Sequence, residues 1–112
     1  MTDASVLERL FATIEARRGA DPEASYTAKL LARGTAKIAQ KVGEEAVETV
    51  IEALRGDRGR LVAESADLVY HLLVLWADAG LRPAEIWAEL ERRAAASGYA
   101  HLGAEPSSND QR

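Results

Sequence analysis

The sequence predicts an all-α protein, an antiparallel helical bundle. Residues with high helix propensity (Ala, Leu, Glu and Arg) are abundant, and aromatic residues make up only 5% of the chain. Apolar residues recur at three- and four-residue intervals, and no segment alternates as a half-buried strand does. A chain of 112 residues fits one domain, which we place at residues 1–98.

Capping residues and glycines mark the first helices. Ser5, with Glu8 three residues later, is expected to cap a first helix that ends at Gly19. Ser25 is expected to cap a second helix that starts with residues 26–31.

Two long helices occupy the middle of the chain. One is expected to begin with Thr35 as its N-cap, after an interruption at Gly34, and to end before Gly56. The next is expected to begin near residues 58–60 and to end before Gly80. Because the connection between them is short, we expect an antiparallel helical hairpin.

A last helix is predicted from Pro83, which suits a first helical turn. Ile86, Trp87 and Leu90 lie on its apolar stripe. The polar composition of residues 99–112 is typical of a flexible C-terminal tail.

Composition excludes several classes of function. The net charge of −4 gives no electrostatic basis for binding nucleic acid, and the absence of cysteine excludes disulfides, thiolate metal sites and cysteine nucleophiles. The N-terminus lacks the pattern of a signal peptide, and the longest apolar stretch, residues 68–77, is too short to cross a bilayer. We expect a cytoplasmic protein with neither nucleic acid nor membrane as a partner.

The helix over residues 61–76 carries charge where burial is expected. Apolar residues surround almost its whole circumference, yet Glu64 and Asp67 lie three apart on one face, with His71 following on that face. Removing a carboxylate from water costs several kcal/mol, so a cationic partner is required.

The preceding helix adds more negative charge instead of compensating it. Its acidic residues are Glu44, Glu45, Glu48 and Glu52. Across a hairpin these carboxylates would repel those of the next helix, and a divalent cation with oxygen ligands, usually Mg²⁺ where phosphates are bound, relieves the conflict. A solvated acidic helix face is the alternative interpretation, and a lone histidine such as His71 is also typical of a core position.

These residues form a recognisable motif. Glu44-Glu45-x-x-Glu48, fifteen residues, then Glu64-x-x-Asp67 resembles the signature of the all-α nucleoside-triphosphate pyrophosphohydrolase (MazG-like) superfamily. Its phosphoribosyl-ATP pyrophosphatase branch is similar in three further segments: Ser25-Tyr26-Thr27, Gly34 to Glu45, and Asp67-Leu68-x-Tyr70-His71-Leu72. The resemblance covers roughly residues 7–92.

This resemblance implies a fold, a partner and a reaction. The fold would be a MazG-like bundle completed by homodimerisation, with active sites near the subunit interface. The reaction would be Mg²⁺-dependent hydrolysis of phosphoribosyl-ATP to phosphoribosyl-AMP and pyrophosphate, the second step of histidine biosynthesis.

The resemblance also suggests residue roles. The expected metal ligands are Glu45, Glu48, Glu64 and Asp67. Glu44 and Glu48 are the candidate catalytic residues, with Glu44 orienting or deprotonating water or acting from the outer shell. The candidate substrate- and phosphate-binding residues are Lys37, Lys41, Arg33, Tyr26 and His71, with Lys29 as a further cation. Without the resemblance, Lys37 and Lys41 are more typical of ordinary surface lysines than of phosphate ligands.

Two other functions are also compatible with the sequence. A house-cleaning pyrophosphatase acting on dUTP, dCTP or a modified nucleotide would share the metal chemistry. A non-catalytic helical dimerisation module would explain the apolar helices, but it would leave Glu64 and Asp67 without a role.

Overall fold

A computed structural model describes residues 2–96, and this range is all-helical, which confirms the predicted fold class. The helices are α1 (Ser5–Ala16), α2 (Tyr26–Arg33), α3 (Thr35–Arg55), α4 (Arg58–Ala79) and α5 (Pro83–Ala95). They fall into two compact units, one reaching to Leu81 and one beginning at Arg82. The predicted tail, residues 99–112, lies outside the described residues. None of the described helices combines the length and apolar content that crossing a bilayer requires.

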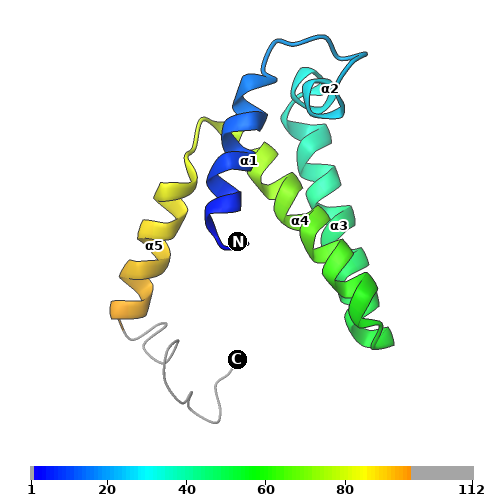
Figure 1. Ribbon diagram of the computed structural model, residues 1–112, viewed down its shortest axis with the longest axis vertical. Coiled ribbons are helices and arrows are strands. Elements are labelled where there is room, and N and C mark those ends of the chain that lie inside the picture. The colour runs from blue at the N-terminus through cyan, green and yellow to red at the C-terminus, as the bar shows by residue number, and fades with distance from the viewer. Residues whose placement is uncertain (1, 97–112) are drawn as a thin grey trace. The chain divides into compact units, whose positions relative to one another are not determined.

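The first unit is built on a long antiparallel hairpin of α3 and α4, as predicted (Figure 1). Gly56 ends α3 in the left-handed region, with φ 77°, and the Asp57 carboxylate accepts a hydrogen bond from the Arg60 backbone N–H at 3.0 Å. This side-chain cap begins α4 directly after the turn. At the opposite end, the Thr35 hydroxyl donates to the Asp78 carboxylate at 2.6 Å, which fixes the register of the two helices.

Helices α1 and α2 pack against one end of this hairpin and form the core there (Figure 1). The buried cluster contains Phe11, Ile14, Leu30, Ile38, Leu73, Val74 and Ala77. Its α4 members all belong to the C-terminal half of that helix. The Arg18 guanidinium donates to the Ala77 carbonyl and so holds the end of α1 beside the end of α4.

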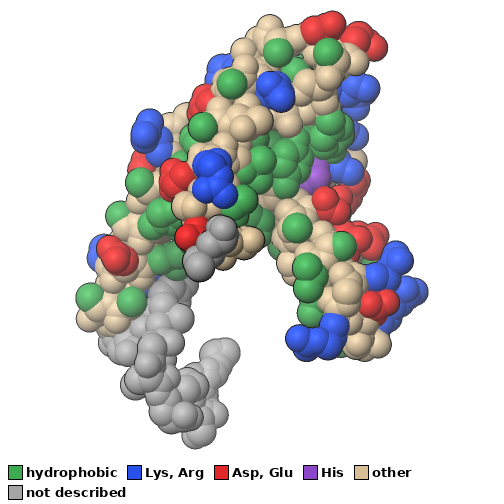
Figure 2. All heavy atoms as spheres, viewed as in Figure 1, with side chains coloured by type: hydrophobic (Ala, Val, Ile, Leu, Met, Phe, Trp, Pro, Cys, Tyr) green, Lys and Arg blue, Asp and Glu red, His purple; other side chains and the backbone are tan. Residues whose placement is uncertain are grey.

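The part of the hairpin near its turn keeps apolar side chains on the surface (Figure 2). Those of α3 are Val47, Val50, Ile51 and Leu54, and that of α4 is Val62, while Val69 is exposed at the middle of α4. Burial of α4 on most sides, as its sequence predicts, therefore holds only for its C-terminal half. The reason is length, because α1 and α2 have 12 and 8 residues and the hairpin helices have 21 and 22.

The cap predictions were right at some helix starts and wrong at others. Ser25 caps α2 by accepting from the Ala28 N–H at 3.1 Å, as predicted. The Ser5 cap is wrong, because Ser5 lies inside α1 and its N–H donates to the Asp3 carboxylate at 2.9 Å. The Thr35 cap is also wrong, because Gly34 takes that position with φ 96°, a backbone conformation that favours glycine.

The second unit contains α5, whose first residue is Pro83, as predicted. The Arg82 N–H donates to the Glu85 carboxylate at 3.0 Å, which satisfies a free donor at the helix start. Near the helix end, hydrogen bonds from Arg92 and Arg93 lower the pKa of Glu89 to about 2.

Candidate metal centre

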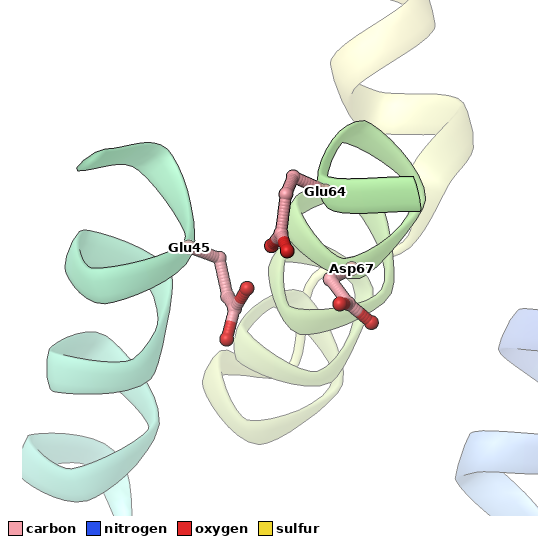
Figure 3. A group of neighbouring side chains, drawn as sticks. All are labelled: Glu45, Glu64 and Asp67. Carbon is pink, nitrogen blue, oxygen red and sulfur yellow. The ribbon is translucent and has the colours of Figure 1, made fainter. Parts of the chain in front are cut away.

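Three acidic side chains converge between α3 and α4. Glu45, Glu64 and Asp67 each place a carboxylate oxygen within 4.8 Å of the other two. Figure 3 shows Glu45 extending from α3 toward α4, with Glu64 and Asp67 on successive turns of α4. Within residues 2–96, this is the cluster of at least three acidic or imidazole side chains that lie close enough together to share a metal ion.

The hairpin itself determines this arrangement. Glu64 and Asp67 are three residues apart and therefore lie on one face of α4. The Thr49 hydroxyl on α3 donates to the Glu45 carbonyl at 2.8 Å and also to the Glu64 carbonyl on α4 at 3.3 Å. This bifurcated contact brings the two helices together at the level of the acidic group.

The electrostatics of the group are unfavourable without a cation. The partly buried position of Glu64 raises the pKa of its carboxyl, and a hydrogen bond with the Glu45 carboxyl raises it further. The negative charges of Glu45, Asp67 and Glu48 act in the same direction. Glu64 therefore competes for a proton, as expected of a carboxylate with several acidic neighbours.

A hard divalent cation fits these donors. All three residues supply carboxylate oxygens, the ligand type that Mg²⁺ prefers. With metal–oxygen distances near 2.1 Å, one Mg²⁺ ion spans oxygens up to about 4.2 Å apart. Small side-chain rotations would bring oxygens that now lie within 4.8 Å into that range.

The other two glutamates of the motif lie beside this group. Glu48 is exposed one turn along α3 from Glu45, outside the close group, but near enough for its charge to act on Glu64. Glu44 is also exposed and accepts hydrogen bonds from Gln40 at 2.8 Å and from Lys41 at 3.1 Å. These two hydrogen bonds lower the pKa of Glu44, with the charge of Lys41 contributing less, so its carboxylate stays ionised.

The candidate phosphate-binding cations differ in their surroundings. Lys41 lies beside the acidic group, with its ammonium 3.8 Å from a Glu45 oxygen, and its hydrogen bond to Glu44 raises its pKa. Lys37, one turn earlier, is partly buried. Arg33 and Lys29 are exposed on α2, and in the described part of the chain neither forms a side-chain hydrogen bond or ion pair.

Tyr26 and His71 lie together at the side of the acidic group. The Tyr26 hydroxyl is 3.1 Å from His71 Nε2, and His71 Nδ1 is 2.7 Å from the Asp67 carbonyl oxygen. His71 is 4% exposed, whereas Tyr26 is 51% exposed. With both ring nitrogens engaged inside the protein, His71 is placed to support Asp67 more directly than to meet a phosphate.

Sequence reasoning missed two structural residues of the hairpin. Thr49, which links the helices beside the acidic group, has no signature in the sequence. Glu52 is 2% exposed, and one of its oxygens lies 3.4 Å from Arg60 Nε while the other has no hydrogen-bond partner among the described residues. In the sequence Glu52 is distinguished only by its place on the acidic stripe of α3, and that place does not indicate a buried side chain.

The chain is similar in sequence to proteins of one named family. A family model described as phosphoribosyl-ATP pyrophosphohydrolase matches residues 7–94. A phosphoribosyl-ATP pyrophosphatase of Azospirillum brasilense is 67% identical over 104 residues, which cover 93% of this chain and 94% of the relative. A protein of the same name from Paramagnetospirillum magneticum is 62% identical, covering 86% and 88%, and one from Gluconobacter oxydans is 55% identical, covering 90% and 76%.

Proposed function

The chain belongs to the phosphoribosyl-ATP pyrophosphohydrolase family, and we propose that it hydrolyses phosphoribosyl-ATP to phosphoribosyl-AMP and pyrophosphate with the acidic group of α3 and α4 as its metal centre. This reaction is a step of histidine biosynthesis. The observation that carries the proposal is the convergence of Glu45, Glu64 and Asp67 from two facing helices.

We assign the metal to Mg²⁺, held by these three carboxylates and by Glu48. The all-oxygen donor set and the raised pKa of Glu64 support this choice. Glu48 lies one turn from Glu45 on the same helix, so a change of its side-chain rotamer would bring its carboxylate toward the group. When bound, Mg²⁺ neutralises charge on a triphosphate and on the departing pyrophosphate.

The surrounding side chains bind and orient the other reactants. Lys41 and Lys37 lie on the α3 turns before Glu45, where their ammonium groups can meet phosphate oxygens as point charges. Arg33 has no competing partner in the described residues and suits a bidentate phosphate contact. Glu44 stays ionised, and as a hydrogen-bond acceptor near the metal centre it is suited to orient the attacking water.

We also propose that the active protein is a homodimer in which a second copy covers the exposed apolar stripe of α3, formed by Val47, Val50, Ile51 and Leu54. With about 100° of rotation per residue, this stripe is centred on the side of α3 opposite Thr49, which contacts α4. An apolar helix face opposite the hairpin partner is what a bundle of two hairpins would bury.

Pyrophosphate release by the purified protein with Mg²⁺ tests this function. We expect phosphoribosyl-ATP to be strongly preferred over ATP, dUTP and dCTP. Asp67→Asn should lower turnover by more than the roughly 10- to 100-fold typical of residues that only support a metal ligand. Glu91→Gln, which removes an exposed carboxylate of α5, serves as the matched control. Preference for a deoxynucleotide would refute the substrate, and full activity of Asp67→Asn would refute the metal centre.

A further inference from the structure

Two hydrogen bonds in series connect the start of α2 to the metal-binding part of α4. The first joins the Tyr26 hydroxyl to His71 Nε2 at 3.1 Å, and the second joins His71 Nδ1 to the Asp67 carbonyl at 2.7 Å. Tyr26 is the first residue of α2, directly after its Ser25 cap. Asp67 belongs to the acidic group proposed to hold the metal.

The chemistry of the partners gives this series a direction. A carbonyl oxygen can only accept, so His71 Nδ1 carries the hydrogen that it donates to Asp67. In the neutral imidazole Nε2 is then an acceptor, and the Tyr26 hydroxyl donates to it. The Asp67 carbonyl thus fixes the His71 tautomer, and the Tyr26 hydroxyl stabilises that tautomer by donating to Nε2. Because His71 is 4% exposed, little water is available to replace either bond.

We propose that Tyr26 is a positioning residue, which through His71 holds the Asp67 turn of α4 in the conformation that binds the metal. This inference rests on the proposed function, because it needs Asp67 to be a metal ligand. His71 lies between the other two residues. It hydrogen-bonds the Asp67 carbonyl directly, and Tyr26 acts on Asp67 only through the His71 ring.

The aromatic surroundings fix the ring that performs this role. Tyr26 stacks on Tyr70 with ring centroids 6.2 Å apart at 27°, and both rings contact His71 edge-on, at 5.9 Å and 4.9 Å. A ring held on one side by Tyr70 and at its hydroxyl by His71 has little freedom to rotate away.

The next residue of α2 provides a matched control. The Thr27 hydroxyl hydrogen-bonds the Tyr70 hydroxyl, so it also ties α2 to α4. This second link ends at Tyr70 and includes no metal ligand. Tyr26→Phe and Thr27→Val each delete one interhelical hydroxyl contact, and the proposal predicts that only the first affects the metal.

The experiment is a titration of each purified full-length variant with Mg²⁺ alone, followed by NMR. The chain has two histidines, His71 and His101, so the imidazole signals are readily assigned. For Tyr26→Phe we expect roughly three- to tenfold weaker Mg²⁺ binding, the effect of one hydrogen bond, and for Thr27→Val a change below about twofold. Nitrogen chemical shifts at alkaline pH should show His71 protonated at Nδ1 in the wild type.

A double-variant cycle tests the route through His71. His71→Asn keeps an amide donor near the Nδ1 position but offers Tyr26 no ring acceptor, so Tyr26→Phe should cause no further loss of Mg²⁺ affinity in that background. Additive losses, equal losses for Tyr26→Phe and Thr27→Val, or a wild-type His71 protonated at Nε2 would each overturn the inference. A wild-type protein that binds no Mg²⁺ would overturn the proposed metal centre, and this inference with it.

Discussion

Leu54→Glu tests the proposed dimer at its most exposed apolar residue. Leu54 is 84% exposed and lies on the α3 stripe with Val47, Val50 and Ile51. In an isolated subunit this substitution changes a side chain that water already surrounds, so the free energy of unfolding should change by less than about 0.5 kcal/mol. In a dimer that buries the stripe, the same side chain is removed from water.

The expected size of the effect follows from that burial. Fully burying a leucine side chain contributes roughly 1.5–3 kcal/mol. A two-fold symmetric interface contains the position twice, so the loss is roughly 3–6 kcal/mol per dimer before any cost of burying a carboxylate is added. This corresponds to a dissociation constant roughly 10² to 10⁴ times higher.

Sedimentation equilibrium across a range of protein concentrations measures this change directly. Val6→Glu places the same charge on an exposed hydrophobic position of α1, 43% exposed, and serves as the control that should leave the dimer intact. If Leu54→Glu associates as tightly as the wild type, then the α3 stripe is not the interface. A monomeric wild type at micromolar concentration would refute the dimer itself.

Two further predictions concern stability. Glu64→Gln should raise the melting temperature in EDTA at neutral pH and abolish the stabilisation by Mg²⁺, since it removes a charge that its acidic neighbours oppose. The folded state raises the pKa of Glu64 above its ordinary value of 4.5. The contribution of Glu64 to folding stability is therefore present below pH 4.5 and is lost as the pH rises through the raised pKa. Mg²⁺ binding, which requires the ionised carboxylate, should weaken on acidification. Melting temperatures measured at several pH values, with and without Mg²⁺, check the direction of both effects. A Glu64→Gln variant that Mg²⁺ still stabilises would contradict the prediction. Asp57→Ala should cost about 1 kcal/mol in urea unfolding because it removes the α4 cap, whereas Asp57→Asn should cost little; equal losses would contradict the capping role.

The sequence was informative where one residue type has one physical use. Gly56 and Gly80 end helices in the left-handed region, and Pro83 begins one, because few other residues suit these positions. Serine and threonine are less specific. Ser5 and Thr35 can cap a helix or lie in its first turn, and the choice depends on Asp3 and Asp78, which accept their hydrogen bonds in the structure.

The acidic group was predictable in part, because helical spacing and a short hairpin connection bring its residues together. Spacing along α4 places Glu64 and Asp67 on one face, and a short hairpin brings Glu45 opposite them. Spacing alone does not determine side-chain direction, which explains why Glu48 lies outside the close group. The link from Tyr26 to His71 depends on how α2 packs against α4, and no local pattern of sequence encodes that contact.

The hairpin that carries the acidic group also limits how this chain can change in length. One residue inserted into α3 between Glu45 and Gly56 would turn Glu45 by about 100° away from α4. Seven residues inserted into each hairpin helix would complete about two turns, leaving an offset of roughly 20° per helix and the carboxylates still facing each other. Natural variants with longer or shorter arms are therefore expected to change both helices by matching steps close to whole turns, such as about seven or about eleven residues. Single insertions should be tolerated beyond the helices, as between Gly56 and Asp57.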